Sequence, residues 1–390
     1  MNVQIIKVYL VAHSQERLVG TLAYKDKKIY FEYDPIFLSS NIELSPYKLP
    51  LKNGIFTCEE TMFDGLFGLF SDSLPDGWGR LLLDRFFLRK SIQYNDITPL
   101  DRLGYIGPYG VGALTYKPYI NGSELEINSI DLDSLSLKSI KILRDDSQQD
   151  LEQLLVLGGS SAGARPKVMV QIDQEDNIIS GSQKIQHGYR HYIIKFASHL
   201  DSKNIGKIEY LYSLMAKKSK IRMTNTKLLQ GKYFAIERFD RIGDARVHIH
   251  SVAGLTHSDF RYPTLDYDDL LSLTLHLTKN VEEQIKMFRL AVFNLFAHNR
   301  DDHAKNFSFL LDENNNWKLA PAYDLTFSQG PGGEHSTTYL GEGKNPTQEH
   351  LIKLANKHNI KNANNVILEV KSAIDAFKLQ TQELNIALDQ

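Results

Sequence analysis

The sequence has 390 residues, 42% of them hydrophobic and 24% charged, which suits a chain with a sizeable buried core and room for two or three domains. The net charge of −2 gives no overall attraction to nucleic acid or to anionic membranes, so any polyanion must be bound by a local patch. The single cysteine, Cys58, excludes an internal disulfide framework and a cysteine-only metal site. The chain has no signal-peptide pattern and no apolar segment approaching the roughly 20 residues that span a bilayer, so we expect a cytoplasmic protein without a membrane partner.

The first part of the chain predicts a small antiparallel sheet. Residues 3–12 and 19–33 are rich in β-branched and aromatic residues, and they are divided by the break HSQERL and the turn-like KDKK. Residues 63–90 then contain a proline–aspartate–glycine turn followed by an amphipathic helix, on which Leu81, Leu82, Leu83, Phe86 and Phe87 are apolar. We assign residues 1–115 to a β-rich amino-terminal subdomain.

The region of residues 116–240 has a different pattern. From about residue 145 it predicts a helix, a glycine-rich turn, the strands KVMVQID and HGYRHYIIKF, the helix IGKIEYLYSLMAKKS and the strand GKYFAIERFDR. This order indicates a mixed α+β lobe.

Residues 241–390 predict a helical lobe. Apolar residues recur every three or four positions in LDYDDLLSLTLHLT and VEEQIKMFRLAVFNLFAHN, and the tail from residue 347 onward has the same spacing. The segment 328–345, rich in glycine and polar residues, is expected to be a mobile loop.

The stretch RDDHAKN after the second of these helices carries the strongest chemical signal. Asp301 and Asn306 are five residues apart, the spacing that protein kinases use for a catalytic aspartate and a magnesium-binding asparagine. FSFLLD, the turn ENNN and WKLA then predict a hairpin that leads to Asp324, a candidate second metal ligand. Loop, hairpin and second aspartate together favour a site of phosphoryl transfer.

Two other interpretations of this stretch stay open. An Asp- and Asn-rich loop could simply cap the helix and form turns. Alternatively, His298, Asp301, Asp302 and His303 could bind zinc or iron in a metallohydrolase, although no H-E-x-x-H helix accompanies them.

Lys195 and Glu209 are candidates for the phosphate-binding pair of a kinase. Lys195 ends the strand HYIIK, and Glu209 follows 14 residues later on an amphipathic helix. A kinase-type enzyme uses such a lysine on the α- and β-phosphates and such a glutamate to orient the lysine. A surface lysine and a solvated helix glutamate are the simpler interpretation of either residue alone, and only their order supports the pairing.

The segment GGSSAGARPK, residues 158–167, is the candidate nucleotide loop. Its glycines permit positive φ angles and a close approach of the backbone to phosphate. It is not a P-loop, because Gly163 is followed by Ala164 and Arg165 rather than by Lys and Ser/Thr, and it does not match G-x-G-x-x-G. A simple turn is the alternative, and the two serines together with Lys167 favour a phosphate-binding role.

Five separated motifs, SSAGARPK, YIIKF, AIERFDR, DDHAKNFSFL and LAPAYDLTF, occur in the order found in the HipA family of serine/threonine-kinase toxins from bacterial type II toxin–antitoxin systems. Upstream, GTLAY, FEYDP and LFSDSLPDGWGR resemble the subdomain that precedes the kinase core in full-length members. The resemblance implies an α+β, bilobal protein-kinase-like fold, with a β-rich N-lobe, an added amino-terminal subdomain and an all-helical C-lobe. It also implies ATP, bound between the lobes, and Mg²⁺ as cofactors.

The resemblance implies a role for individual residues. Asp301 is expected to be the catalytic base, and Asn306 and Asp324 are expected to bind Mg²⁺. Lys195 is expected to contact the ATP phosphates, and Glu209 to orient it. The other residues placed near ATP are Ala162, Gly163, Ala164, Arg165, Pro166 and Lys167 in the loop, Glu237, Arg238 and Phe239 at the adenine, and His303 and Tyr323.

Ser160 matches the serine whose autophosphorylation ejects the loop and inactivates kinases of this family, and the adjacent Ser161 is the less favoured alternative. A phosphate here would repel the phosphates of the nucleotide, and the basic residues Arg165 and Lys167 could bind it elsewhere.

The resemblance also implies partners. Toxins of this family phosphorylate an aminoacyl-tRNA synthetase, which stalls translation and promotes dormancy, and they bind a small helix-turn-helix antitoxin. Because the chain has no helix dense in Arg and Lys, contact with operator DNA is expected mainly through the antitoxin. Two alternatives remain: a small-molecule kinase, and an inactive scaffold for an antitoxin–DNA repressor complex.

Overall fold

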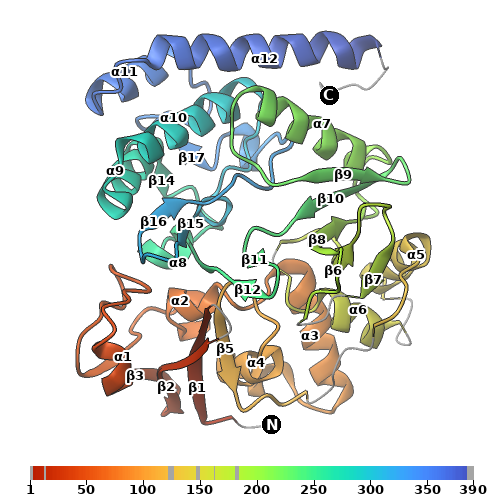
Figure 1. Cartoon of the computed structure of the whole chain (residues 1–390), viewed down its shortest axis with the longest axis vertical. Coiled ribbons are helices and arrows are strands. Elements are labelled where there is room, and N and C mark those ends of the chain that lie inside the picture. The colour runs from red at the N-terminus through yellow and green to blue at the C-terminus, as the bar shows by residue number, and fades with distance from the viewer. Residues whose placement is uncertain are drawn as a thin grey trace. The chain divides into compact units, whose positions relative to one another are not determined.

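The computed structural model describes residues 3–12, 15–121, 127–145, 150–161, 163–180 and 184–383, and Figure 1 labels its elements. The chain is a mixed α/β protein with several sheets, and it divides into two compact units. Unit 1 consists of Met1–Lys203, Tyr233–His250 and Gly254–His257. Unit 2 consists of Asn204–Lys232, Ser251–Ala253 and Ser258–Gln390. In the described ranges, no helix has the length and apolar character needed to cross a membrane.

The first sheet of unit 1 confirms the predicted antiparallel sheet. Its strands are β1 (Ile5–Ala12), β2 (Gln15–Lys25), β3 (Lys28–Tyr33), β4 (Ile55–Thr57) and β5 (Leu114–Lys117), in the spatial order β4-β3-β2-β1-β5. The predicted break HSQERL is too long, because Gln15 and Arg17 pair with Ala12 and Leu10 and so belong to β2. Polar residues occupy this end of the strand because it is exposed there.

Four α-helices lie between strands β3 and β5 in the described part of the chain. They are α1 (Pro35–Leu38), α2 (Gly68–Ser71), α3 (Gly77–Arg89) and α4 (Pro99–Ile106). Helix α3 confirms the predicted amphipathic helix, since Leu82, Leu83 and Phe87 are fully buried. Helix α4 begins with a capping box, in which Thr98 and Asp101 bind each other's backbone N–H groups.

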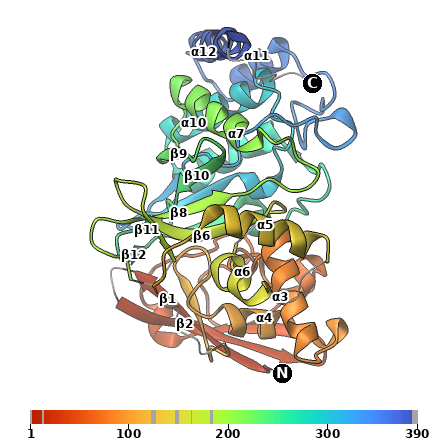
Figure 2. The ribbon, with the colours of Figure 1, turned by 90° about the vertical axis from the view of Figure 1, so that its right-hand side faces the viewer.

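The second sheet of unit 1 contains the predicted strands of the middle region. Strands β7 (Ile178–Ser180), β6 (Lys167–Ile172), β8 (Arg190–Lys195) and β10 (Tyr233–Glu237) are neighbours in that order and run antiparallel. Helices α5 (Leu132–Leu143) and α6 (Leu151–Gly158) precede them, and α6 packs on β6 (Figure 2). All six residues of β6 are buried, including the polar residues Lys167 and Gln171. A short hairpin, β11 (Arg241–Ile242) and β12 (Ala245–Arg246), follows.

Unit 2 contains the predicted helices α7 (Ile205–Lys218), α9 (Tyr267–Thr278), α10 (Val281–Phe296), α11 (Gln348–Lys357) and α12 (Ala363–Glu383). Helix α10 packs against both α9 and α12 (Figure 1). Its apolar residues at three- and four-residue spacing, such as Phe288, Val292 and Leu295, are buried. Strand β9 (Thr226–Leu229) follows α7, and strand β13 (His248–Ser251) and helix α8 (Val252–Thr256) contain boundaries between the units.

The expectation of an all-helical carboxy-terminal lobe is wrong. In addition to the predicted hairpin, which is formed by β15 (Ser308–Leu311) and β16 (Trp317–Leu319), unit 2 contains the parallel pair β14 (Leu265–Asp266) and β17 (Thr337–Thr338). Strand β17 lies in the segment 328–345, which was expected to be a mobile loop. Hydrogen bonds from Ser336 to Arg300 and from Tyr339 to Ala291 hold this segment against α10 and the loop that follows it.

Candidate functional site

The loop that follows α10 brings three of the predicted site residues together. The amide Nδ2 of Asn306, at the end of the 3-10 turn Ala304–Asn306, donates a hydrogen bond of 2.6 Å to the backbone oxygen of Asp301. The His303 Nε2 atom lies 3.8 Å from Asp301 Oδ1, and the Asp301 side chain is 55% exposed. The carboxylate of Asp301 is therefore accessible to a substrate. Since the Asn306 nitrogen is used in this bond, its amide oxygen is the atom that could bind a cation.

Asp324 is held next to this loop by its neighbour Tyr323. The Tyr323 hydroxyl donates to the backbone oxygen of Lys305 at 2.6 Å and lies 2.6 Å from Ser308 Oγ. Because a tyrosine has one hydroxyl hydrogen, Ser308 must be the donor in the second bond. Asp324 itself has a φ of 56°, an unusual value for a residue other than glycine. Such backbone conformations cluster at functional sites.

Asp302, named from the sequence only as a possible metal ligand, has a structural role that the sequence did not reveal. Its carboxylate is fully buried and accepts hydrogen bonds from the Tyr267 hydroxyl at 2.8 Å, His335 Nδ1 at 2.9 Å and the Thr337 backbone at 3.2 Å. Burial, followed by the Asp302 charge, raises the pKa of Tyr267, so this hydroxyl stays a donor. Asp302 therefore anchors the loop from inside while Asp301 faces outward.

The bonds made by Asp302 count against the metallohydrolase interpretation. That interpretation requires Asp302 to ligate a metal together with His298, Asp301 and His303, yet the Asp302 carboxylate is occupied by internal donors. In the parts of the chain that the structure describes, no group of three or more His, Cys, Asp or Glu side chains could hold a metal ion.

The glycine-rich loop begins where α6 ends, at Gly158. Ser161 is 1% exposed, and its hydroxyl donates to the backbone oxygen of Gly158 at 2.6 Å. Ser160 is partly exposed, and its hydroxyl lies 3.7 Å from the Met169 sulfur. Ser160 is thus the more accessible of the two hydroxyls. Ala162 lies outside the described residues.

The segment Asp76 to Gly79 packs against the glycine-rich loop and is hydrogen-bonded to it. The Gly163 backbone N–H donates to the Asp76 carboxylate, and the Trp78 N–H donates to the Gly163 oxygen at 2.9 Å. Gly77 has a φ of +43°, and a Cβ there would lie 2.6 Å from the Ala164 Cα. The sequence indicated only a turn at this Pro-Asp-Gly. The structure shows that it is the support of the candidate nucleotide loop.

Two lysines lie on one face of the second sheet, beside this loop. Lys167 in β6 and Lys195 in β8 are directly opposite in the antiparallel register. A Cβ at Gly163 would collide with the Lys167 ammonium, so this ammonium lies against the loop. The Phe196 N–H donates to the Pro166 oxygen at 2.8 Å, which ties the end of the loop to the end of β8.

Arg165 is engaged by an acidic neighbour. Its Nε lies 3.1 Å from Asp201 Oδ1. Burial alone would raise the pKa of Asp201, but hydrogen bonds from Ser198 and the charge of Arg165 outweigh it and lower that pKa. Arg165 is therefore paired with an ionised carboxylate.

The motif ERFDR begins at the end of β10. Glu237 lies 3.0 Å from Arg190 in an exposed ion pair, and Phe239 is partly exposed. The guanidinium of Arg238 is bound internally, because it donates to both oxygens of Asp240, at 2.9 and 2.8 Å. Glu237 and Phe239 therefore stay candidates for contacts with adenine, whereas the Arg238 side chain serves the fold.

Lys195 and Glu209 lie in different units. Glu209, on α7, is 3% exposed. Its pairing with Lys195, and the meeting of Lys195 with Asp301, Asn306 and Asp324, stay predictions.

Comparisons with known proteins connect both units to one family. The family model of the HipA N-terminal domain matches residues 10–117, and that of the HipA-like C-terminal domain matches residues 159–377. A Haemophilus influenzae protein named "Putative kinase" is 30% identical over 102 residues, which are 24% of this chain and 30% of that protein. The chain thus spans less than a third of this relative's length.

The structure resembles that of HipA from Shewanella oneidensis MR-1, solved with HipB and its operator DNA. The two chains are 18% identical, with a TM-score of 0.68 over 96% of this chain and 91% of that chain. This likeness shows that the two share a fold. The Helicobacter pylori proinflammatory kinase CtkA is 12% identical, with a TM-score of 0.34 over 50% of this chain and 92% of that chain.

Proposed function

Because the chain belongs to the HipA family, we propose that it is the kinase toxin of a toxin–antitoxin pair and transfers the γ-phosphate of ATP to a protein serine or threonine. The observation that carries this proposal is the pair Lys167 and Lys195, which face each other across two strands beside the glycine-rich loop. Two lysines paired across neighbouring strands, one of them with its ammonium against the glycine-rich loop, suit a polyphosphate.

The residues of unit 2 fit Mg²⁺. Asn306 and Asp324 supply amide and carboxylate oxygens, the ligand atoms that Mg²⁺ prefers. Tyr323, the neighbour of Asp324, bonds through its hydroxyl to Lys305 and Ser308, which lie on either side of Asn306 along the chain. The ion would neutralise charge on the transferred phosphoryl group, and Asn306 and Asp324 are the residues that would hold it.

Asp301 would accept the proton of the attacking hydroxyl. Its carboxylate is more than half exposed, so it can meet a protein substrate. The loop is fixed by the buried bonds of the adjacent Asp302, which keeps the base in a defined position. Lys195 would bind the ATP phosphates, with Glu209 as its orienting partner, and Glu237 and Phe239 would contact the adenine.

Regulation would act through Ser160. Its hydroxyl is accessible, whereas that of Ser161 is buried in a hydrogen bond to Gly158. A phosphate on Ser160 would repel the nucleotide phosphates and favour an ejected loop. Incubation of unmodified protein with Mg-ATP, followed by mass spectrometry, should find phosphate on Ser160, and Ser160→Ala should abolish the signal while Ser161→Ala should not.

The proposed partners follow the family. The protein substrate would be an aminoacyl-tRNA synthetase, the antitoxin a small helix-turn-helix protein, and operator DNA would be bound mainly through the antitoxin. In the Shewanella oneidensis complex, HipA is found with HipB and its operator DNA.

Radiolabelled ATP added to a cell lysate tests the proposal. Wild type should label a protein band, and Asp301→Gln should label none because the base is missing. The matched control is Glu313→Gln, which removes an exposed carboxylate from the hairpin turn and should retain activity. Equal labelling by Asp301→Gln would refute the assigned base. Faster transfer to a small acceptor would indicate a small-molecule kinase, and no ATP turnover would indicate a scaffold.

A further inference from the structure

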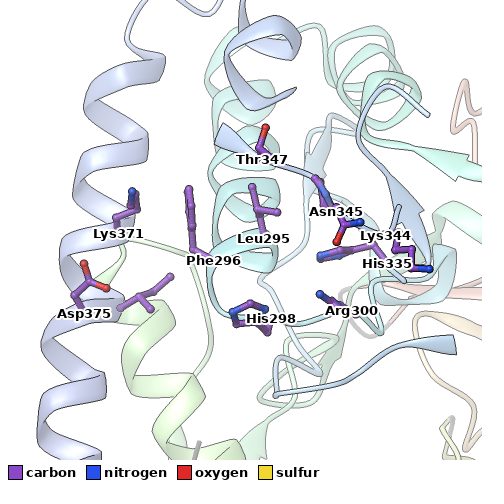
Figure 3. Close-up of a pocket in the computed structure, with 12 residues that line it drawn as sticks. Leu295, Phe296, His298, Arg300, His335, Lys344, Asn345, Thr347, Lys371 and Asp375 are labelled. Atoms are coloured by element: carbon purple, nitrogen blue, oxygen red, sulfur yellow. The ribbon is translucent and has the colours of Figure 1, made fainter. Parts of the chain in front are cut away.

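A cavity of about 390 Å³ lies in unit 2, on a part of the molecule that the proposed site does not use (Figure 3). It is bounded by the end of α10, the chain on either side of Arg300, the segment around residue 344, and α12. Leu295 and Phe296 of α10 and Ile374 of α12 give it an apolar side. Asp301, Asn306 and Asp324 are not among its lining residues.

The polar lining of this cavity is mainly basic. Its lining contains three cationic side chains, Arg300, Lys344 and Lys371, and one carboxylate, Asp375. The imidazole rings of His298 and His335 also line it. Figure 3 shows Arg300, His335 and Lys344 close together, with Lys371 on the opposite side, on α12. The local potential is therefore positive although the whole chain carries a charge of −2.

Two details strengthen the case for an anion. Arg300 donates one hydrogen bond, from Nη1 to the Gly333 oxygen at 2.6 Å, while its Nε–H is buried without an acceptor among the described residues. Thr347, the N-cap of the ten-residue helix α11, also lines the cavity. The positive end of that helix therefore adds to the charges of the basic side chains.

From this combination we infer that the cavity binds a small amphiphilic anion, a molecule with an apolar body and a phosphate or carboxylate group. A bare inorganic ion would leave most of the volume and the apolar side unused, since pockets of about 300–1,000 Å³ suit organic ligands. The anionic group lies at Arg300 and Lys344, and the body contacts Phe296 and Ile374.

Two residues, Arg300 and His335, connect this cavity to the loop that carries Asp301. Arg300 directly precedes Asp301, and its backbone oxygen accepts from the Ser336 N–H at 3.1 Å. His335, which lines the cavity, binds the Asp302 carboxylate at 2.9 Å. A ligand that contacts both side chains restrains the two neighbours of Asp301. Binding and this restraint are measurable without ATP, so the inference does not depend on the proposed function.

Calorimetric titration of the full chain tests the binding. The probes are phenyl phosphate, benzoate, inorganic phosphate and benzyl alcohol, and the first two separate the two possible anionic groups. Phenyl phosphate or benzoate should bind at least fivefold more tightly than inorganic phosphate, and benzyl alcohol should not bind. Lys344→Gln should weaken binding about three- to tenfold, and Lys371→Gln, on the opposite side of the cavity, should weaken it less. The matched control is Lys353→Gln, an exposed lysine of α11 outside the cavity, which should leave it unchanged.

Three results would overturn the inference. One is the absence of binding by both aromatic anions. Another is equal weakening by Lys353→Gln, which would indicate unspecific attraction. The third is a result in which Lys195→Ala loses binding and Lys344→Gln retains it, which would place the probe at the lysine pair of unit 1. Hydrogen exchange of residues 300–306 should slow in saturating phenyl phosphate, and unchanged exchange would remove the link to the loop.

Discussion

Replacing Asp240 with asparagine removes a carboxylate that lies between two buried guanidinium groups of unit 1. Asp240 is 4% exposed, and it accepts from Arg238 Nη2 at 2.8 Å, Arg241 Nη1 at 2.7 Å and the Gly112 N–H at 2.8 Å. Removing one partner of a buried ion pair costs about 3–5 kcal/mol, because the remaining charge is left uncompensated. Asparagine retains one acceptor oxygen, so we expect the lower end, about 3 kcal/mol.

The effect should depend on pH in a defined direction. Burial alone would raise the pKa of Asp240, but the charges of Arg238 and Arg241 outweigh it and hold that pKa far below its usual range. A carboxyl whose pKa is lowered on folding stabilises the fold fully above its unfolded pKa of about 4. This contribution is lost as the pH falls below that value. The difference between wild type and Asp240→Asn should therefore be constant near neutral pH and shrink below about pH 4.

The assay uses the two tryptophans of the chain, one in each unit. Trp78 is buried in unit 1 and Trp317 in unit 2, so a Trp317→Phe background leaves a fluorophore that reports on unit 1. Urea unfolding followed by Trp78 fluorescence gives the free energy of unfolding of that unit. Glu16→Gln is the matched control, because it breaks an exposed ion pair with Lys117 and should cost at most about 1 kcal/mol.

A loss below about 1 kcal/mol in Asp240→Asn, equal to that of Glu16→Gln at neutral pH, would refute the reasoning. It would mean that the two arginines find water or other acceptors when the carboxylate is absent.

Three further predictions follow from buried contacts. Asp302→Ala leaves the Tyr267 hydroxyl and two other donors without their acceptor, so it should destabilise unit 2 by about 2–5 kcal/mol. Urea unfolding followed by Trp317 fluorescence in a Trp78→Phe background checks this loss. Gly77→Ala forces a side chain into a backbone with a φ of +43°, and Trp78 fluorescence should report a loss of about 1–3 kcal/mol. Burial lowers the pKa of His248 to about 4, so its neutral ring stabilises the fold fully above pH 6.5 and this contribution is lost toward pH 4. His248→Gln should accordingly flatten the change of unfolding free energy across that range.

The sequence by itself determined the features that depend on neighbours along the chain. Enrichment in β-branched and aromatic residues predicted β1 to β3, helical spacing predicted α9 and α10, and the Asn-rich turn predicted the hairpin of β15 and β16. The grouping of Asp301 and Asn306 belongs to this class, because both lie in one short loop closed by their own hydrogen bond. Spacing along the chain sets such contacts directly.

Only the tertiary structure decided the contacts between distant segments. Lys167 and Lys195 become neighbours through the register of β6 and β8, and a shift by one residue would turn one of them to the other face. Asp76 reaches Gly163 across 87 residues, and His335 reaches Asp302 across 33. These bonds form because the packing of distant elements brings a donor next to an acceptor, and no local pattern encodes which segment supplies the partner.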